Sequence, residues 1–170
     1  FEALNNPVIA VITALIVTTI LQSSSVTVSV LVLLAGAGLV EPLPCLFFIL
    51  GANIGSCTPA VMAAMSASRN AKRAAFIHLM FNVVGLVVFS IILIFAGEHV
   101  INGVFAISGA ENFKRFVANA DTIFKTAQCV ILLPCSNLLI KLSRKVIHAK
   151  PGEEHDEDEM ILKFIGTSGA

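Results

Sequence analysis

Two long stretches without charge constrain this chain more than any other feature. Residues Pro7 to Val40 and Pro42 to Ser68 contain no Lys, Arg, His, Asp or Glu. Each stretch is longer than the roughly 20 residues that a helix needs to cross the hydrocarbon core of a bilayer. Charged residues make up 13% of the chain, and soluble domains usually carry about 25%. The sequence therefore predicts an all-α polytopic membrane protein.

Each of the first two apolar blocks, over about residues 7–40 and 43–67, has a polar or glycine-rich interruption. The first contains "QSSS" (22–25) and the second contains "GANIGSCTP" (51–59). Backbone can leave the helix at membrane depth only where protein or a water-filled cavity satisfies its polar groups. We therefore expect two discontinuous or re-entrant helical segments around a polar cavity, as in transporters with broken helices. Two ordinary kinked spans are the alternative.

Two plain spans are expected next, over about residues 74–96 and 116–140, with an external loop between them. Basic residues cluster before the first span and after the second: Arg69, Lys72, Arg73, Lys141, Arg144, Lys145 and Lys150. By the positive-inside rule both clusters are cytoplasmic. The same rule places the C-terminus in the cytoplasm.

A cavity between the first two blocks would offer hydroxyls, amides and backbone dipoles. Residues 1–68 contain no Lys, Arg or His, and their only acids are Glu2 and Glu41. Half-helix N-termini bind anions through free N–H groups, and hydroxyl and carbonyl oxygens bind Na⁺. An anion without a basic side chain remains poorly compensated, so a co-bound cation is its natural partner. These features favour cation-coupled anion transport.

The Gln-Ser cluster fits an anion site. Ser is a favoured N-cap, and consecutive Ser residues present several hydroxyls within a short distance. Close packing of helices through small residues is the alternative for the Ser residues. Packing explains Gln22 poorly, because a buried primary amide must satisfy two donors and an acceptor.

The glycines of "GANIG" allow two interpretations. Gly51 and Gly55 either permit an unwound turn that presents the oxygens of Asn53, Ser56 and Thr58, or pack two helices as a G-x-x-x-G pattern. The sequence "SCTP" follows directly. We expect the unwound turn.

Asp121 and Lys125 stand four residues apart within the last expected span. Each charge alone would cost about 2.5–3.5 kcal/mol at a helix centre, so an i,i+4 ion pair is expected. The pair is either a gating or coupling element, or a structural pair that snorkels near the outer interface. The structural pair is our expectation.

Neither a disulfide framework nor a metal site is indicated. The four cysteines lie in apolar stretches without C-x-x-C spacing, and we expect them to be small buried hydrophobes: Cys45, Cys57, Cys129 and Cys135. The sequence also lacks the H-E-x-x-H, G-x-S-x-G and phosphate-loop motifs of enzymes. We do not expect an enzyme.

The pair "QSSS" and "GANIG", about thirty residues apart, resembles the repeat signature of the type II-related sodium/phosphate cotransporters. The similarity extends through "RNAKRAAFIHLMFNVVG" (69–85) and "VANADTIFKTAQCVILLP" (117–134). The resemblance implies that residues 1–147 form the second of two inverted repeats, with two broken helices and two full spans. It implies that residues 148–170 are a cytoplasmic acidic linker at the start of a PhoU-like domain. Asp121 and Lys125 depart from the family pattern.

The resemblance also implies a function and its residues. It implies sodium-coupled transport of inorganic phosphate by alternating access, with Na⁺ as the coupling ion and no other metal or cofactor. The phosphate-binding residues would be Gln22, Ser23, Ser24 and Ser25, and those for sodium or the second face of the site would be Asn53, Ser56 and Thr58. A carrier for another oxyanion or a dicarboxylate is one alternative, and a non-transporting membrane scaffold is another.

The expected partners are phosphate, Na⁺, the lipid bilayer and a second QSSS repeat, with no nucleic acid. Phe1 follows no Met or cleavage signal, so we interpret the sequence as part of a longer chain. The second repeat would come from a missing N-terminal half or from another copy, since half a site does not transport alone. The expected location is the bacterial inner membrane.

Overall fold

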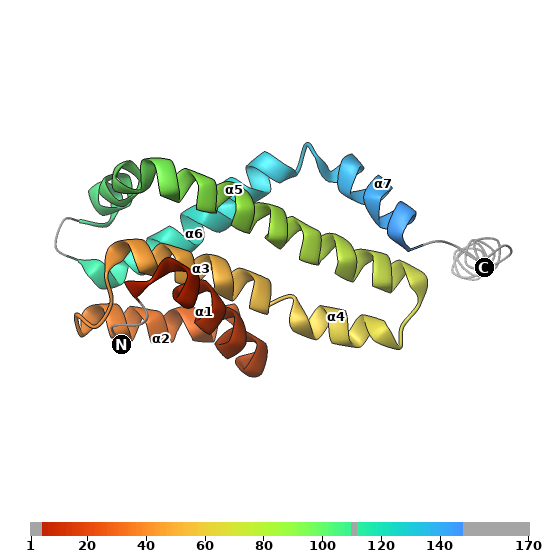
Figure 1. Ribbon diagram of the computed structural model, residues 1–170, viewed down its shortest axis with the longest axis horizontal. Coiled ribbons are helices and arrows are strands. Elements are labelled where there is room, and N and C mark those ends of the chain that lie inside the picture. The colour runs from red at the N-terminus through yellow and green to blue at the C-terminus, as the bar shows by residue number, and fades with distance from the viewer. Residues whose placement is uncertain (1–4, 110–111, 148–170) are drawn as a thin grey trace, which may run out of the picture.

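A computed structural model of the chain describes residues 5–109 and 112–147. These residues form helices without any strand (Figure 1). The helices are α1 (Pro7–Leu21), α2 (Ser24–Gly36), α3 (Pro42–Gly55), α4 (Thr58–Met65), α5 (Arg69–Ser108), α6 (Phe113–Leu132) and α7 (Ser136–Val146). The expected acidic linker and PhoU-like segment, residues 148–170, lie outside the described residues.

The first apolar block is a hairpin of two short helices. α1 ends where Gln22 adopts a left-handed φ of 54°, and α2 begins after Ser23, whose backbone is extended. The hydroxyl of Thr18 donates to the hydroxyl of Thr27 over 2.9 Å, so residues on either side of the turn meet, and Figure 1 shows α2 returning beside α1. The 15 residues of α1 extend about 22 Å. Neither arm therefore crosses a core of about 30 Å.

The second apolar block continues forward through a small break. α3 and α4 together form an apolar stretch of 24 residues, which is long enough to cross a membrane. The break is confined to Ser56 and Cys57, and α4 begins with Thr58 and Pro59. Proline suits the first turn of a helix because its missing N–H needs no partner there. Both interruptions expected from the sequence are therefore present, but only the first reverses the chain.

The two glycines of "GANIG" pack α3 against α1. A Cβ added to Gly51 would lie 2.3 Å from the carbonyl oxygen of Val11, and one added to Gly55 would lie 2.7 Å from Cβ of Thr18. The facing positions of α1 carry small buried residues: Ala10, Ala14 and Thr18. This is packing of the G-x-x-x-G kind. The expected unwound turn at these glycines is wrong, because α3 stays helical through Gly55.

α5 is longer than the span expected at 74–96. It runs for 40 residues and bends at Ala96, where φ is −133° and ψ is 22°. Most of the expected loop between residues 97 and 115 is therefore helical, because the apolar pattern continues through "VINGVFAI" (100–107). The phenyl rings of Phe105 and Phe116 stack at 4.3 Å and hold this continuation against α6.

The last expected span, over residues 116–140, is divided into α6 and α7. The two helices meet at an angle of 79°. Pro134 lies at the bend, where its ring and its missing N–H prevent a continuous helix. Within the described residues, two helical stretches are long and apolar enough to span a membrane, and α6 with α7 would make a third. The chain is thus an all-α polytopic membrane protein.

The two basic clusters lie at the same end of the molecule. The guanidinium of Arg73, near the start of α5, donates to the carbonyl oxygen of Ile147 after α7, with distances of 3.3 and 3.2 Å. Figure 1 shows the α4–α5 turn and the end of α7 at one end of the bundle. The α1–α2 break and the end of α3 lie between this end and the opposite one.

Candidate binding site at two helix breaks

The two helix breaks lie side by side. The hydroxyl oxygens of Thr19, in the last turn of α1, and Thr58, the first residue of α4, are 3.2 Å apart. A groove of about 190 Å³ follows this contact and is lined by Leu15, Thr19, Ile54, Gly55, Cys57, Thr58, Val61 and Leu79. Segments about forty residues apart in the sequence thus place their interrupted backbones together.

The first break presents polar groups at the N-terminus of α2. The Ser23 hydroxyl caps this helix by accepting from the Val26 N–H over 3.4 Å, as expected for an N-cap serine. The side chains of Gln22, Ser24 and Ser25 form no hydrogen bond within residues 5–109 and 112–147. Gln22 and Ser25 are exposed and Ser24 is half-buried. An amide and two hydroxyls therefore remain available beside the positive end of the helix dipole.

The second break has an amide that lacks a partner. Asn53 is 5% exposed, and its side-chain Nδ2 has no hydrogen-bond partner among the described residues. Its main-chain oxygen accepts from the Ser56 hydroxyl over 2.7 Å. A buried polar group without a partner costs about 1–3 kcal/mol. Such a group is a candidate for contact with a ligand.

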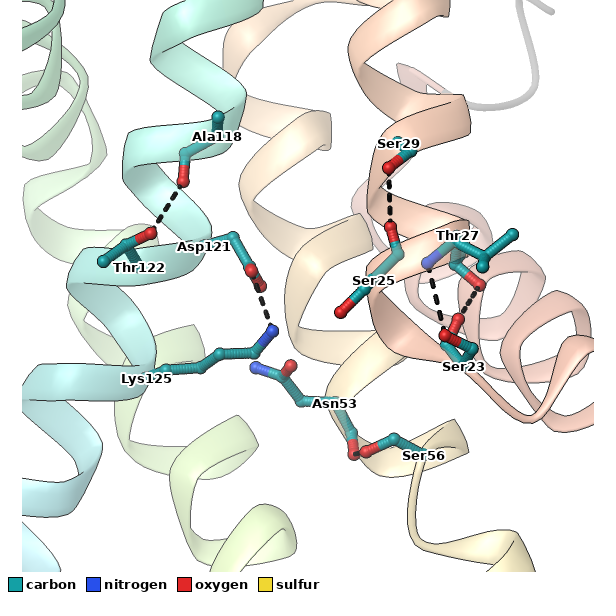
Figure 2. A network of polar contacts seen from close by, with 11 residues as sticks. Ser23, Ser25, Thr27, Ser29, Asn53, Ser56, Ala118, Asp121, Thr122 and Lys125 are labelled. Carbon is teal, nitrogen blue, oxygen red and sulfur yellow. Dashed lines mark hydrogen bonds and ion pairs between the residues drawn. The ribbon is translucent and has the colours of Figure 1, made fainter.

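The expected ion pair on α6 is confirmed, and it faces the broken helices. The ammonium of Lys125 lies 2.7 Å from Oδ2 of Asp121, with side-chain exposures of 39% and 17%. Figure 2 shows both side chains directed toward α2 and α3, with the Lys125 ammonium pointing toward the Asn53 amide. The other carboxylate oxygen of Asp121 is buried without a partner in the described part of the chain. The pair therefore lies beside the helices that contain the two interruptions.

A buried amide on α6, Gln128, was missed by the sequence analysis. It is 3% exposed, and its Nε2 donates to the carbonyl oxygen of Phe81 over 3.0 Å. It lies over Gly85, where an added Cβ would meet its Cδ at 2.5 Å. Asn82, one turn before Gly85 on α5, donates to Sγ of Cys57 over 3.2 Å. The argument that applied to Gln22, a primary amide in an apolar stretch, could have found Gln128.

The cysteine prediction holds for two of the four residues. Cys45 and Cys57 are buried, whereas Cys129 and Cys135 are exposed. The prediction was wrong for the last two because Cys129 lies on an outer face of α6 and Cys135 lies at the α6–α7 bend, where no other described helix covers them. Within the described residues, no group of three or more His, Cys, Asp or Glu could hold a metal ion.

Residues 1–107 match the Na⁺/Pi-cotransporter family. The chain belongs to this family of Na⁺/Pi-cotransporters. The expected resemblance is thereby confirmed. Because the family is one of transporters, this Na⁺/Pi-cotransporter chain is not an enzyme.

Relatives of this Na⁺/Pi-cotransporter chain come from bacteria and mammals. The Bacillus subtilis protein YqeW, described as uncharacterised, is 30% identical over 141 residues, which cover 83% of this chain and 44% of YqeW. Sodium-dependent phosphate transport protein 2A of Oryctolagus cuniculus is 31% identical over 168 residues, covering 95% of this chain and 25% of the relative, and the Rattus norvegicus protein gives the same values. The chain thus spans less than half the length of these relatives. No solved structure matches it.

Proposed function

We propose that this chain forms one repeat of a sodium-coupled transporter of inorganic phosphate that works by alternating access. The observation that carries the proposal is the contact of the two helix breaks through Thr19 and Thr58 at 3.2 Å. Membership of the Na⁺/Pi-cotransporter family supplies the substrate and the coupling ion. Interrupted helices of this kind hold substrate and ions in other transporters.

Phosphate binds at the first break in this proposal. The hydroxyls of Ser24 and Ser25 and the amide of Gln22 donate hydrogen bonds to its oxygens, together with free N–H groups in the first turn of α2. Ser23 contributes mainly as the N-cap that shapes this turn. The free N–H groups and the helix dipole together favour an anion at this position.

The second break forms the other face of the site. The hydroxyl oxygens of Ser56 and Thr58, with carbonyl oxygens freed at the break, are suitable ligands for Na⁺. Asn53 closes this face with its unpartnered amide. Sodium at this face offsets part of the phosphate charge, which explains why the two would move together.

A second pair of broken helices completes the pathway in this proposal, from another part of the protein or from another copy. In this proposal the α4–α5 turn and the end of α7 lie on the cytoplasmic side of a bacterial inner membrane, which the two basic clusters favour. The Arg73 contact with Ile147 is consistent with a shared side.

Uptake of labelled phosphate into proteoliposomes tests the proposal. We expect an inward sodium gradient to drive uptake and an equal potassium gradient to fail. Gln22→Ala and Ser24→Ala should each lower uptake at least about tenfold, the effect of losing roughly 1.4 kcal/mol of binding. Ser29→Ala is the matched control, because its hydroxyl already donates to the Ser25 carbonyl oxygen over 2.8 Å.

The rival functions give different results. A membrane scaffold predicts no sodium-driven uptake and no effect of either Ala substitution. A carrier for another oxyanion or a dicarboxylate predicts that sulfate, arsenate or succinate competes better than unlabelled phosphate. Uptake that is indifferent to sodium would also contradict the proposal.

A further inference from the structure

The broken helices lack a basic side chain, but α6 brings one to them. Residues 5–68 contain no Lys, Arg or His, so the proposed anion site has only dipoles and hydroxyls of its own. α6 packs along both α2 and α3. Lys125 extends from α6 toward the Asn53 amide, and the Ser25 side chain lies on the neighbouring α2 (Figure 2). A positive charge is thus brought to these helices by α6, from another part of the repeat.

The buried atoms around this lysine are incompletely paired. Asn53 is almost fully buried, and its Nδ2 donor has no partner among the described residues. Among the described residues the Lys125 ammonium has one partner, the Asp121 carboxylate at 2.7 Å. An ammonium carries three donors. The Lys125 ammonium and the unpartnered amide of Asn53 thus lie on facing helices. Two donor groups in this position suit an anion with several oxygens.

We propose that Lys125 binds the transported oxyanion directly and that Asp121 holds the ammonium while the site is empty. This inference rests on the proposed function and deepens it. When phosphate enters, the flexible stem of Lys125 turns its ammonium from Asp121 toward a phosphate oxygen, and Asn53 donates to the same anion. No covalent bond changes and the lysine keeps its proton. Phosphate and Asp121 thus compete for one cation.

This competition predicts that substitutions of Lys125 and of Asp121 change the KM for phosphate in opposite directions. Lys125→Met removes a charge-assisted hydrogen bond to the anion, which is roughly twice as strong as a neutral one. We expect the KM for phosphate to rise about tenfold or more. Asp121→Asn removes the competing carboxylate, so the KM should fall. The double variant should behave like Lys125→Met, because nothing remains for Asp121 to release.

A purely structural ion pair predicts another pattern. Each single variant would then leave an unpaired charge and lower the thermal stability of the protein in detergent, and the double variant would restore both stability and KM. That restoration would overturn the inference. An unchanged KM in Lys125→Met would overturn it as well. Lys114→Met is the matched control, because Lys114 is exposed near the start of the same helix.

A binding measurement separates this inference from the proposed function. Inorganic phosphate should raise the melting temperature of the purified protein, and Lys125→Met should lose this shift while the Lys114→Met control keeps it. Stabilisation that depends on Lys125 without any uptake would overturn only the transport proposal. Neither stabilisation nor uptake in the wild-type protein would overturn both. Stabilisation and uptake that survive Lys125→Met unchanged would overturn the inference alone.

Discussion

At the scale of single residues, Gln22 has two separable roles. Its φ of 54° is the one positive value at a non-glycine residue within the described residues, and it reverses the chain between α1 and α2. Its backbone N–H donates to the Thr18 carbonyl oxygen over 2.7 Å, while its side chain is left for a ligand. The main chain thus shapes the turn, and the amide is free to serve the proposed site.

Substitution of Gln22 should separate these roles. Gln22→Gly accepts the left-handed backbone without penalty, so we expect normal thermal stability with loss of phosphate uptake. Gln22→Val places a β-branched residue where positive φ is strongly disfavoured, so stability should fall as well. Melting curves in detergent beside uptake assays check both. Equal stability of the two variants would contradict the left-handed turn.

Glycine substitutions should show which glycines maintain helix contact. Gly51→Ala places a Cβ 2.3 Å from a backbone oxygen of α1, whereas Gly103→Ala meets nothing within 4 Å. We expect Gly51→Ala to lower the melting temperature clearly, because overpacking costs about 1–3 kcal/mol. Gly103→Ala should match the wild type or exceed it slightly, since Ala favours a helix by about 0.5–1 kcal/mol. A tolerated Gly51→Ala would argue against the packed α1–α3 contact.

The sequence predicts interactions within one helix better than the contacts that a helix makes with its neighbours. The Asp121–Lys125 pair was predictable from spacing and from the cost of isolated charge, and its distance of 2.7 Å agrees. The role of Gly51 was not predictable, because a G-x-x-x-G pattern does not reveal which backbone approaches it. The direction of the ion pair depends on the rotation of α6 against α2 and α3, which no local pattern encodes.

At the scale of helices, the two interruptions look alike in sequence and differ in space. Both interruptions were predictable, because polar and glycine-rich residues in an apolar block lower stability unless they form a turn, a helix contact or a site. The first folds back because Gln22 is left-handed and Ser23 is extended. The second continues because Ser56 and Cys57 keep helix-like angles. Composition alone does not distinguish these two backbone paths.

A cysteine pair should test whether the breaks touch. In a protein with its native cysteines replaced by Ala, Thr19→Cys and Thr58→Cys together should form a disulfide under mild oxidation, since the native hydroxyls are 3.2 Å apart and a disulfide needs Cα atoms within about 7 Å. Loss of reactivity with a maleimide reports the bond. Thr13→Cys with Thr58→Cys is the control, because position 13 lies about 9 Å further along α1. Equal cross-linking of both pairs would contradict the arrangement.

At the scale of the whole molecule, the sequence grouped two basic segments that the structure brings to one end of the bundle. Charge alone grouped the region before α5 with the region after α7, and the Arg73 contact with Ile147 brings them together. The lengths of α5 and α6 were not predictable in the same way. Ala96 bends α5 without a proline, and the helix continues into the expected loop as far as Ser108.

Labelling from one side should test the orientation. A cysteine at Ser68 should react with an impermeant maleimide only after cells are permeabilised, and one at Asn112 should react in intact cells. The physical reason is the retention of basic loops in the cytoplasm. Labelling of position 68 alone in intact cells would reverse the orientation. Labelling of both positions in intact cells would refute it.

The close packing of Gly51 and Gly55 against α1 limits how α1 and α3 can move relative to one another. With Gly51 and Gly55 set against the main chain of α1, no layer of side chains remains along which the two helices could slide. They therefore form a single rigid unit that contains both interruptions. If the protein works by alternating access as proposed, the switch from one side of the bilayer to the other arises in the partners around this unit. Among the described helices, α6 contacts α2 and α3 and carries Lys125, so it would respond to each change.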